Sequence, residues 1–130
     1  IDAVVTDHAP HEWEEKDQEF NLAPSGFVGL ETSVGAMLTY MYHKGNIDLM
    51  TLVNAMSTAQ AKILGLDAGV IAPGKEADLT VLDLDKEWTV DASKFYSKGK
   101  ASPFDEMIFK GKAAATIVNG KIVMKNGEVL

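Results

Sequence analysis

The sequence predicts an α/β fold in two parts, with one strand and several helices over residues 1–66 and a small β domain over residues 67–130. Three observations support this prediction. A short β-branched run opens the chain, as expected for a buried parallel strand. Apolar residues then recur at helical spacing up to Leu64. The last third alternates with period two and holds two Asn-Gly pairs, which favour hairpin turns.

Composition narrows the classes of function. The chain has 130 residues, a hydrophobic share of 46% and no cysteine, so we expect a real core without disulfides or thiolate metal sites. The net charge is -7 and every basic residue is a lysine, which argues against a nucleic-acid partner. No apolar run is long enough to cross a bilayer, and no basic leader opens the chain. A cytoplasmic enzyme fits these features.

The first strand is expected at Ile1–Thr6, with apolar residues on both faces. A polar connection follows over Asp7–Ser25, which is long for a loop in a compact domain and therefore indicates a functional or flexible segment. We interpret its acidic cluster as a solvated surface.

Three helices are expected after this connection. The first covers Gly29–Lys44. Asp48 is a suitable N-cap for the second, because its carboxylate can accept the free N–H groups of a first helical turn. Thr58 is placed as the cap of the third, which covers Ala59–Leu64 and ends at Gly65.

Residues 67–130 are predicted to consist mainly of strands. Alternation predicts one strand at Ala77–Leu84 and a second at Trp88–Val90, followed by an ordered loop from Asp91 to Phe109. Asn119-Gly120 lies between two apolar runs and predicts a tight hairpin, and Asn126-Gly127 predicts another turn.

The residues with the clearest chemical potential are Asp7 and His11. A carboxylate at the carboxyl end of a parallel strand can bind a divalent metal, act as a general base, or do both, although a turn cap is an equal alternative. Pro10 argues against a helix between the two residues, so we expect His11 to contact substrate and not to share a metal with Asp7. A plain surface histidine is the alternative.

Other polar residues receive structural interpretations. We expect His8 to pack behind the strand and His43 to lie at a helix C-terminus, where a positive charge is favourable. Ser25-Gly26 can bring backbone groups close to a ligand, or can simply form a turn. Asp83 and Asp85 share one strand face and are expected to point to solvent.

The residue count limits what the chain does alone. It has three histidines, no cysteine and one well-placed acid, too few ligands for a binuclear metal site. Any catalytic role for Asp7 therefore requires groups outside these residues.

Two stretches carry a family resemblance. Val4–His11 and Ala23–Thr32 resemble the last barrel strand and following loop of bacterial dihydroorotase, a metal-dependent cyclic amidohydrolase. The later stretches Ala61–Leu66, Ala77–Asp83 and Thr116–Lys121 resemble the C-terminal part of amidohydrolases. The resemblance covers essentially the whole chain, and its first motif is the more specific.

The resemblance implies a fragment of a TIM-type (β/α)8 barrel, namely the last βα unit with its helices, followed by part of a small β domain. It implies that Asp7 binds metal and carries a proton to the leaving amide nitrogen during reversible hydrolysis of dihydroorotate to N-carbamoyl-aspartate. It also implies that His11 contacts the substrate carboxylate, and that Ser25 and Gly26 bind the pyrimidine ring through their backbone. The implied cofactor is zinc, as two ions in an intact enzyme of pyrimidine biosynthesis.

The sequence departs from the family pattern at several positions. Ser25 stands where a larger residue is common, and Gln60 stands where proline is frequent. The other metal ligands of the family are absent, so we expect these residues alone to be inactive. A hydantoinase, an allantoinase or a non-catalytic scaffold subunit is the alternative. A homodimer and an association with aspartate transcarbamoylase are further expectations, with a small molecule as substrate.

Overall fold

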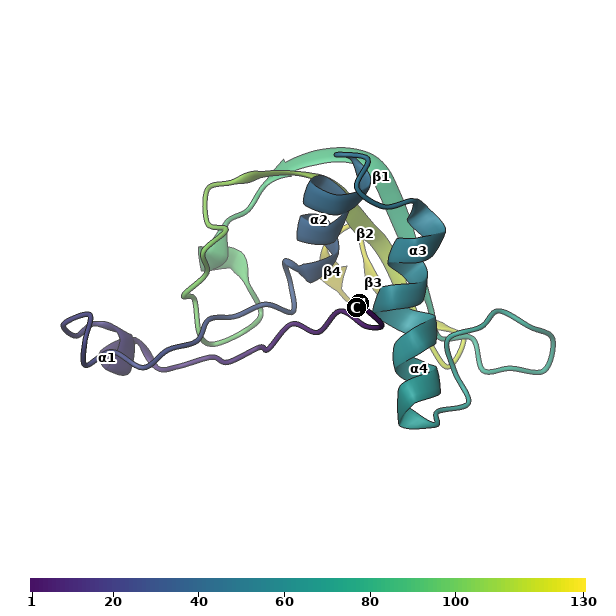
Figure 1. Cartoon of the computed structure of the whole chain (residues 1–130), viewed down its shortest axis with the longest axis horizontal. Coiled ribbons are helices and arrows are strands. Elements are labelled where there is room, and N and C mark those ends of the chain that lie inside the picture. The colour runs from purple at the N-terminus through teal and green to yellow at the C-terminus, as the bar shows by residue number, and fades with distance from the viewer.

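The computed structural model describes all 130 residues as a four-stranded antiparallel sheet with helices on one side. An arm with α1 (Trp13–Lys16) near its tip extends away from this body (Figure 1). The sheet has the order β1-β2-β3-β4. Its strands are β1 (Leu79–Thr89), β2 (Ile108–Val118), β3 (Lys121–Lys125) and β4 (Glu128–Val129).

The hairpin turns occur at the two predicted Asn-Gly pairs. Asn119 and Gly120 have φ of 49° and 73°, and they connect β2 to β3. Asn126 and Gly127, at 53° and 91°, connect β3 to β4. Positive φ at both central residues is what a type I′ turn requires, so the local chemistry was sufficient to locate these turns.

The predicted break between two strands near residue 85 is wrong. Residues 79–89 form the single strand β1, which pairs with β2 along its length. The pairing shifts register between Asp83 and Glu87. A bulge of this kind inserts unpaired residues without ending the strand, which explains the interruption of the apolar alternation. Asp83 and Asp85 are exposed, as expected. The expected loop contains the short helix η3 (Ala92–Lys94), and β2 begins at Ile108.

The helices lie in two continuous runs. The first consists of α2 (Ser33–Met37) and the π-helical η1 (Leu38–Tyr42), within the predicted range. The second joins α3 (Leu49–Val53), η2 (Asn54–Thr58) and α4 (Ala59–Leu64). No helix is long and apolar enough to cross a membrane.

Asp48 caps the second run as predicted. Its carboxylate accepts the Thr51 N–H at 2.8 Å, and this bond lowers the pKa of Asp48. Gly65 ends the run with φ of 67°, also as predicted. The predicted cap at Thr58 is wrong, because this residue has helical φ and ψ of -61° and -46°. Its hydroxyl instead donates to the Gly69 carbonyl at 2.8 Å, so a tertiary contact uses the group that sequence reasoning assigned to a cap.

The predicted strand at Ile1–Thr6 is also not observed. The segment is irregular and lies beside the second helical run, where the Val4 N–H donates to the Ala55 carbonyl at 2.9 Å. Gln60 donates to the Val4 carbonyl from the same run. A strand exists only through pairing with a neighbour, and these residues have none among the four strands of the sheet.

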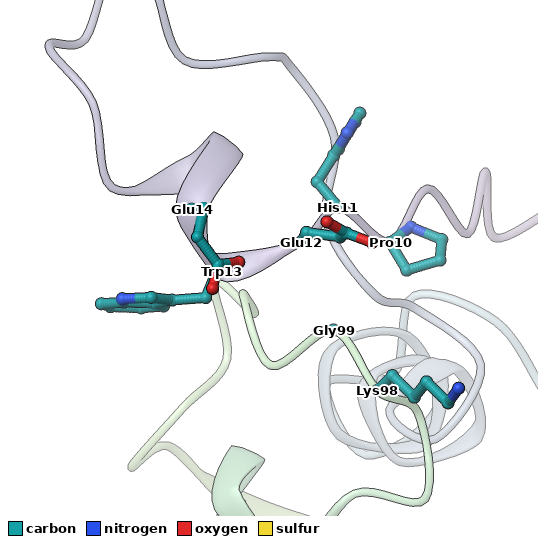
Figure 2. Close-up of a pocket in the computed structure, with 7 residues that line it drawn as sticks. All are labelled: Pro10, His11, Glu12, Trp13, Glu14, Lys98 and Gly99. Atoms are coloured by element: carbon teal, nitrogen blue, oxygen red, sulfur yellow. The ribbon is translucent and has the colours of Figure 1, made fainter.

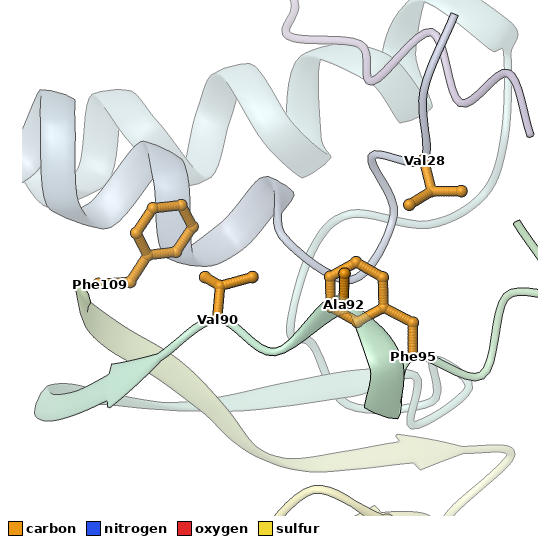
Figure 3. Packing of buried hydrophobic residues seen from close by; sticks show 5 residues of the cluster. All are labelled: Val28, Val90, Ala92, Phe95 and Phe109. Atoms are coloured by element: carbon orange, nitrogen blue, oxygen red, sulfur yellow. The ribbon is translucent and has the colours of Figure 1, made fainter. Parts of the chain in front are cut away.

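The hydrophobic core lies between α2, β2 and the loop after β1. Its buried members are Val28, Val90, Ala92, Phe95 and Phe109 (Figure 3). Phe109 is fully buried and makes edge-to-face contacts with three aromatic rings at centroid distances of 5.3 to 5.8 Å, namely Tyr40, Trp88 and Phe104. Only 13 of 130 residues are buried. Since five of them belong to this cluster, it accounts for much of the packing between the helices and the sheet.

Gly111 allows η1 to pack closely on β2. A Cβ at this position would lie 2.6 Å from Leu38 Cδ1, and its φ is 98°. Gly120 shares a positive φ of 73°, but a Cβ on it would have open space on all sides, with no contact within 4 Å. We expect Gly111→Ala to lower the free energy of unfolding by about 1–3 kcal/mol more than Gly120→Ala, because only the first adds overpacking to backbone strain. Urea denaturation of both variants measures this difference, and equal losses would contradict the packing argument.

Candidate functional site

The candidate site lies on the arm. Residues 6–11 lie beside residues 25–29, and the short helix α1 (Trp13–Lys16) is near the tip (Figure 1). One backbone bond ties the two sides together, from the Ala9 N–H to the Phe27 carbonyl at 3.0 Å. Hydrogen bonds from the side chains of His8, His11 and Lys16 supply most of the other links between the two sides. The arm therefore brings residues 7–11 next to residues 24–27.

Asp7 is exposed and forms neither a hydrogen bond nor an ion pair with the rest of the chain. Its φ of 45° lies in the left-handed region, which aspartate tolerates better than most residues. The carboxylate does not cap a turn, so the alternative of a turn cap finds no support. An unpaired carboxylate of this kind can bind a cation or accept a proton.

The His11 ring is held on both sides. Its Nε2 lies 2.9 Å from the Ser25 carbonyl oxygen, and its Nδ1 lies 3.2 Å from Glu15 Oε2. Both partners are acceptors, so a ring with a proton on each nitrogen satisfies both at once. Its side chain is 26% exposed, which leaves it accessible to a small molecule at the arm surface.

Gly26 is required where the two sides of the arm meet. It has φ of 122°, a value that side chains rarely permit. A Cβ there would lie 2.8 Å from the Ala9 Cβ and 3.3 Å from His11 Nε2. The structure thus places the predicted residues His11, Ser25 and Gly26 together, whereas Asp7 has no bond to any of them.

A shallow pocket of about 300 Å³ lies on one side of the arm. Figure 2 shows its lining, in which the His11 ring points away from Gly99 and the Trp13 ring extends outward. The lining residues are Pro10, His11, Glu12, Trp13, Glu14, Lys98 and Gly99. Gly99 is buried, and a Cβ on it would meet the Pro10 Cβ at 3.0 Å. The β-rich part therefore contacts the arm directly beside His11.

The other two histidines make structural contacts. His8 Nδ1 accepts the Gly29 N–H at 3.1 Å, so this ring links the two sides of the arm. His43 lies at the C-cap position of η1, as expected. Its Nε2 lies 2.8 Å from the Leu84 carbonyl oxygen of β1, because the ring reaches across to the sheet.

No group of three or more His, Cys, Asp or Glu side chains is close enough to hold a metal ion. Asp7 fits a divalent cation as one hard oxygen ligand, since its carboxylate is exposed and unpaired. The structure adds no second ligand beside it.

Sequence reasoning missed Glu15 and Lys16, which it grouped with the solvated charges. Lys16 Nζ donates to the carbonyls of Pro24 and Gly26 at 2.9 and 3.0 Å. The four-residue spacing of His11 and Glu15 was a usable signal. It was not considered, because Glu15 was grouped with the acidic surface cluster; α1 begins at Trp13, between the two residues.

Comparisons with known proteins agree on the family. The model of the Amidohydrolase family matches residues 1–123. The dihydroorotase of Geobacter metallireducens is 53% identical over 125 residues, which cover 96% of this chain and 29% of that protein. The dihydroorotase of Acetivibrio thermocellus is 42% identical over 130 residues, which are 100% of this chain and 30% of that protein.

Solved structures of related enzymes superimpose closely. The L-hydantoinase from Arthrobacter aurescens has a TM-score of 0.94 at 41% identity, and the D-hydantoinase from Thermus sp. has 0.90 at 31%. Both comparisons cover 100% of this chain and 30% of the other. The chain spans about 30% of the length of the relatives it matches. On the match of the family model over residues 1–123, the chain belongs to the amidohydrolase family.

Proposed function

We propose that the complete protein containing these residues is a dihydroorotase, which adds water across the ring amide bond of dihydroorotate to give N-carbamoyl-aspartate, and which also catalyses the reverse reaction. The observation that carries this proposal is the 53% identity to a dihydroorotase over nearly the whole chain. The arm supports it, because an unpaired Asp7 lies on the same segment as a His11 ring bonded to the Ser25 carbonyl.

Each site residue has a proposed role. Asp7 binds a metal ion and carries a proton between the attacking water and the leaving amide nitrogen. His11 contacts the substrate carboxylate, which fits an imidazole that already faces a carboxylate, Glu15, in this structure. Ser25 and Gly26 contact the pyrimidine ring through backbone groups.

Amidohydrolases are generally metal-dependent, and we propose zinc, as two ions, for the complete protein. Asp7 would hold one of them, and the remaining ligands come from residues outside this chain. When bound, the metal supplies Lewis-acid activation of water and of the ring carbonyl.

We propose that these 130 residues are inactive alone, because the other ligands are absent from them. The second helical run also exposes large apolar side chains that a neighbouring part of a longer protein could cover. These are Met50, Ile63 and Leu64, with exposed fractions of 72%, 63% and 69%. A cytoplasmic location, a homodimer and an association with aspartate transcarbamoylase complete the proposal.

A hydantoinase is the second candidate. Its support is the TM-score of 0.94 at 41% identity to the L-hydantoinase of Arthrobacter aurescens. Hydantoin lacks the carboxylate that His11 would bind, so the substrate itself distinguishes the two candidates. The hypothesis of an allantoinase is tested in the same way, because allantoin also lacks this carboxylate. If the protein is a non-catalytic scaffold subunit, none of the substrates is turned over.

The test is a substrate panel with the complete gene product, loaded with zinc. We expect kcat/KM on dihydroorotate to exceed that on hydantoin and on allantoin by at least about a hundredfold, because the carboxylate contact is lost with the other two substrates. A preference for hydantoin would contradict the proposal and favour the second candidate. Absence of turnover on all three, with metal bound, would favour the scaffold.

A further inference from the structure

Lys16 contacts the same turn that His11 does. Its ammonium donates to the Pro24 carbonyl at 2.9 Å and to the Gly26 carbonyl at 3.0 Å. The His11 ring bonds the carbonyl between them, that of Ser25, at 2.9 Å. Three successive carbonyl groups therefore face the segment that contains His11 and Lys16.

This arrangement fixes the direction of three N–H groups. Every peptide bond in the chain is trans, so the N–H of each peptide unit points opposite to its carbonyl. The N–H groups of Ser25 and Phe27 thus point away from Lys16, and the N–H of Gly26 points away from the His11 ring. None of the three donates to another group of the protein. Carbonyls of an ordinary strand alternate in direction, and the unusual φ of Gly26 permits the departure.

The charge of Lys16 strengthens this array. Its side chain is partly buried, and it forms no ion pair with a carboxylate, so both of its bonds are to peptide carbonyls. A cation bonded to a carbonyl oxygen polarises the peptide unit and makes its N–H a better donor. Glu15, its neighbour, pairs with His11 instead.

We propose that Lys16 is a positioning residue: it holds the Pro24–Gly26 turn so that the N–H groups of Ser25 and Phe27 face an oxygen-rich, anionic substrate. Lys16 acts from behind the turn and does not itself contact the substrate. This inference rests on the proposed function, since it assumes that the turn binds the substrate ring.

The experiment compares Lys16→Met, Lys16→Gln and Lys16→Arg in the complete, metal-loaded gene product. We expect Lys16→Met to raise KM for dihydroorotate about tenfold, because two charge-assisted bonds are lost, with kcat changed by less than about threefold. Lys16→Gln keeps N–H donors without the charge and is expected to give an intermediate KM. Lys16→Arg keeps the charge and the donors and should restore most of the affinity. Lys121→Met, at the exposed hairpin, is the matched control.

The outcomes separate this inference from the proposed function. Unchanged KM in the Met and Gln variants of an active enzyme would overturn the role of Lys16 alone. The same holds for a lower kcat at constant KM, or for a Tm loss in Lys16→Met that Lys16→Arg does not repair. A wild-type protein without activity on dihydroorotate would overturn the proposed function, and the inference with it.

Discussion

Replacing Asp7 with asparagine is expected to lower kcat of the complete gene product on dihydroorotate by about 10²–10⁴-fold, the usual contribution of a positioned proton-transfer group. Asparagine keeps the size of the side chain and tolerates the left-handed φ of 45°, so the substitution removes the titratable group without straining the backbone. Steady-state kinetics with dihydroorotate, and with N-carbamoyl-aspartate for the reverse reaction, measures the loss in both directions.

Two controls make the Asp7 result specific. Asp2→Asn removes an exposed carboxylate five residues earlier and should leave kcat within about twofold of wild type, as expected away from functional groups. Asp7→Ala should lose at least as much activity as Asp7→Asn, and it adds backbone strain because alanine disfavours positive φ. Activity of Asp7→Asn within a few-fold of wild type would rule out proton transfer by this residue.

The substitution Phe109→Ala is expected to lower the free energy of unfolding by about 3–5 kcal/mol, the typical cost of removing a buried aromatic side chain. Phe109 is fully buried and contacts the rings of Tyr40, Trp88 and Phe104. The backbone of α2 also approaches it closely, since a Cβ on Gly35 would lie 2.7 Å from Phe109 Cδ2. Truncation therefore opens a cavity between α2 and the sheet.

Urea denaturation of the complete gene product measures this effect, with Phe20→Ala as the control. Phe20 is 100% exposed on the arm, so its loss should change stability by no more than about 0.5 kcal/mol. A similar decrease in the free energy of unfolding for both variants would show that the Phe109 cluster is not the main contact that stabilises the packing of the helices on the sheet.

Local chemistry explains which elements the sequence could predict. The Asn-Gly turns, the Asp48 cap and the Gly65 helix end each depend on a few adjacent residues, and the structure confirms them. Thr58 was misassigned because its partner, Gly69, lies 11 residues away. His43 was placed correctly at a helix end, but its contact with Leu84, 41 residues away, was not foreseen. A local pattern cannot reveal which distant carbonyl a side chain reaches.

The candidate site follows the same division. The types and order of Asp7, His11, Ser25 and Gly26 were sufficient to predict that the candidate site lies on this segment. The roles of these residues stay predictions, and so does the domain boundary at residues 66–67. Lys16 was invisible in the sequence, because its two acceptors are backbone carbonyls that carry no side-chain signature. The strand expected at Ile1–Thr6 depends on neighbours that the sheet of this chain does not supply.

The close approach of Gly99 to Pro10 bears on how such proteins can be recombined. A hybrid that joins residues 1–66 of one relative to residues 67–130 of another takes the arm and the sheet from different parents. Yet any side chain at residue 99 would push on Pro10 and the His11 carbonyl, which lie 3.0 and 3.3 Å from a Cβ built there. A hybrid of this kind is therefore expected to require a glycine at residue 99, or a small shift of residues 10 and 11.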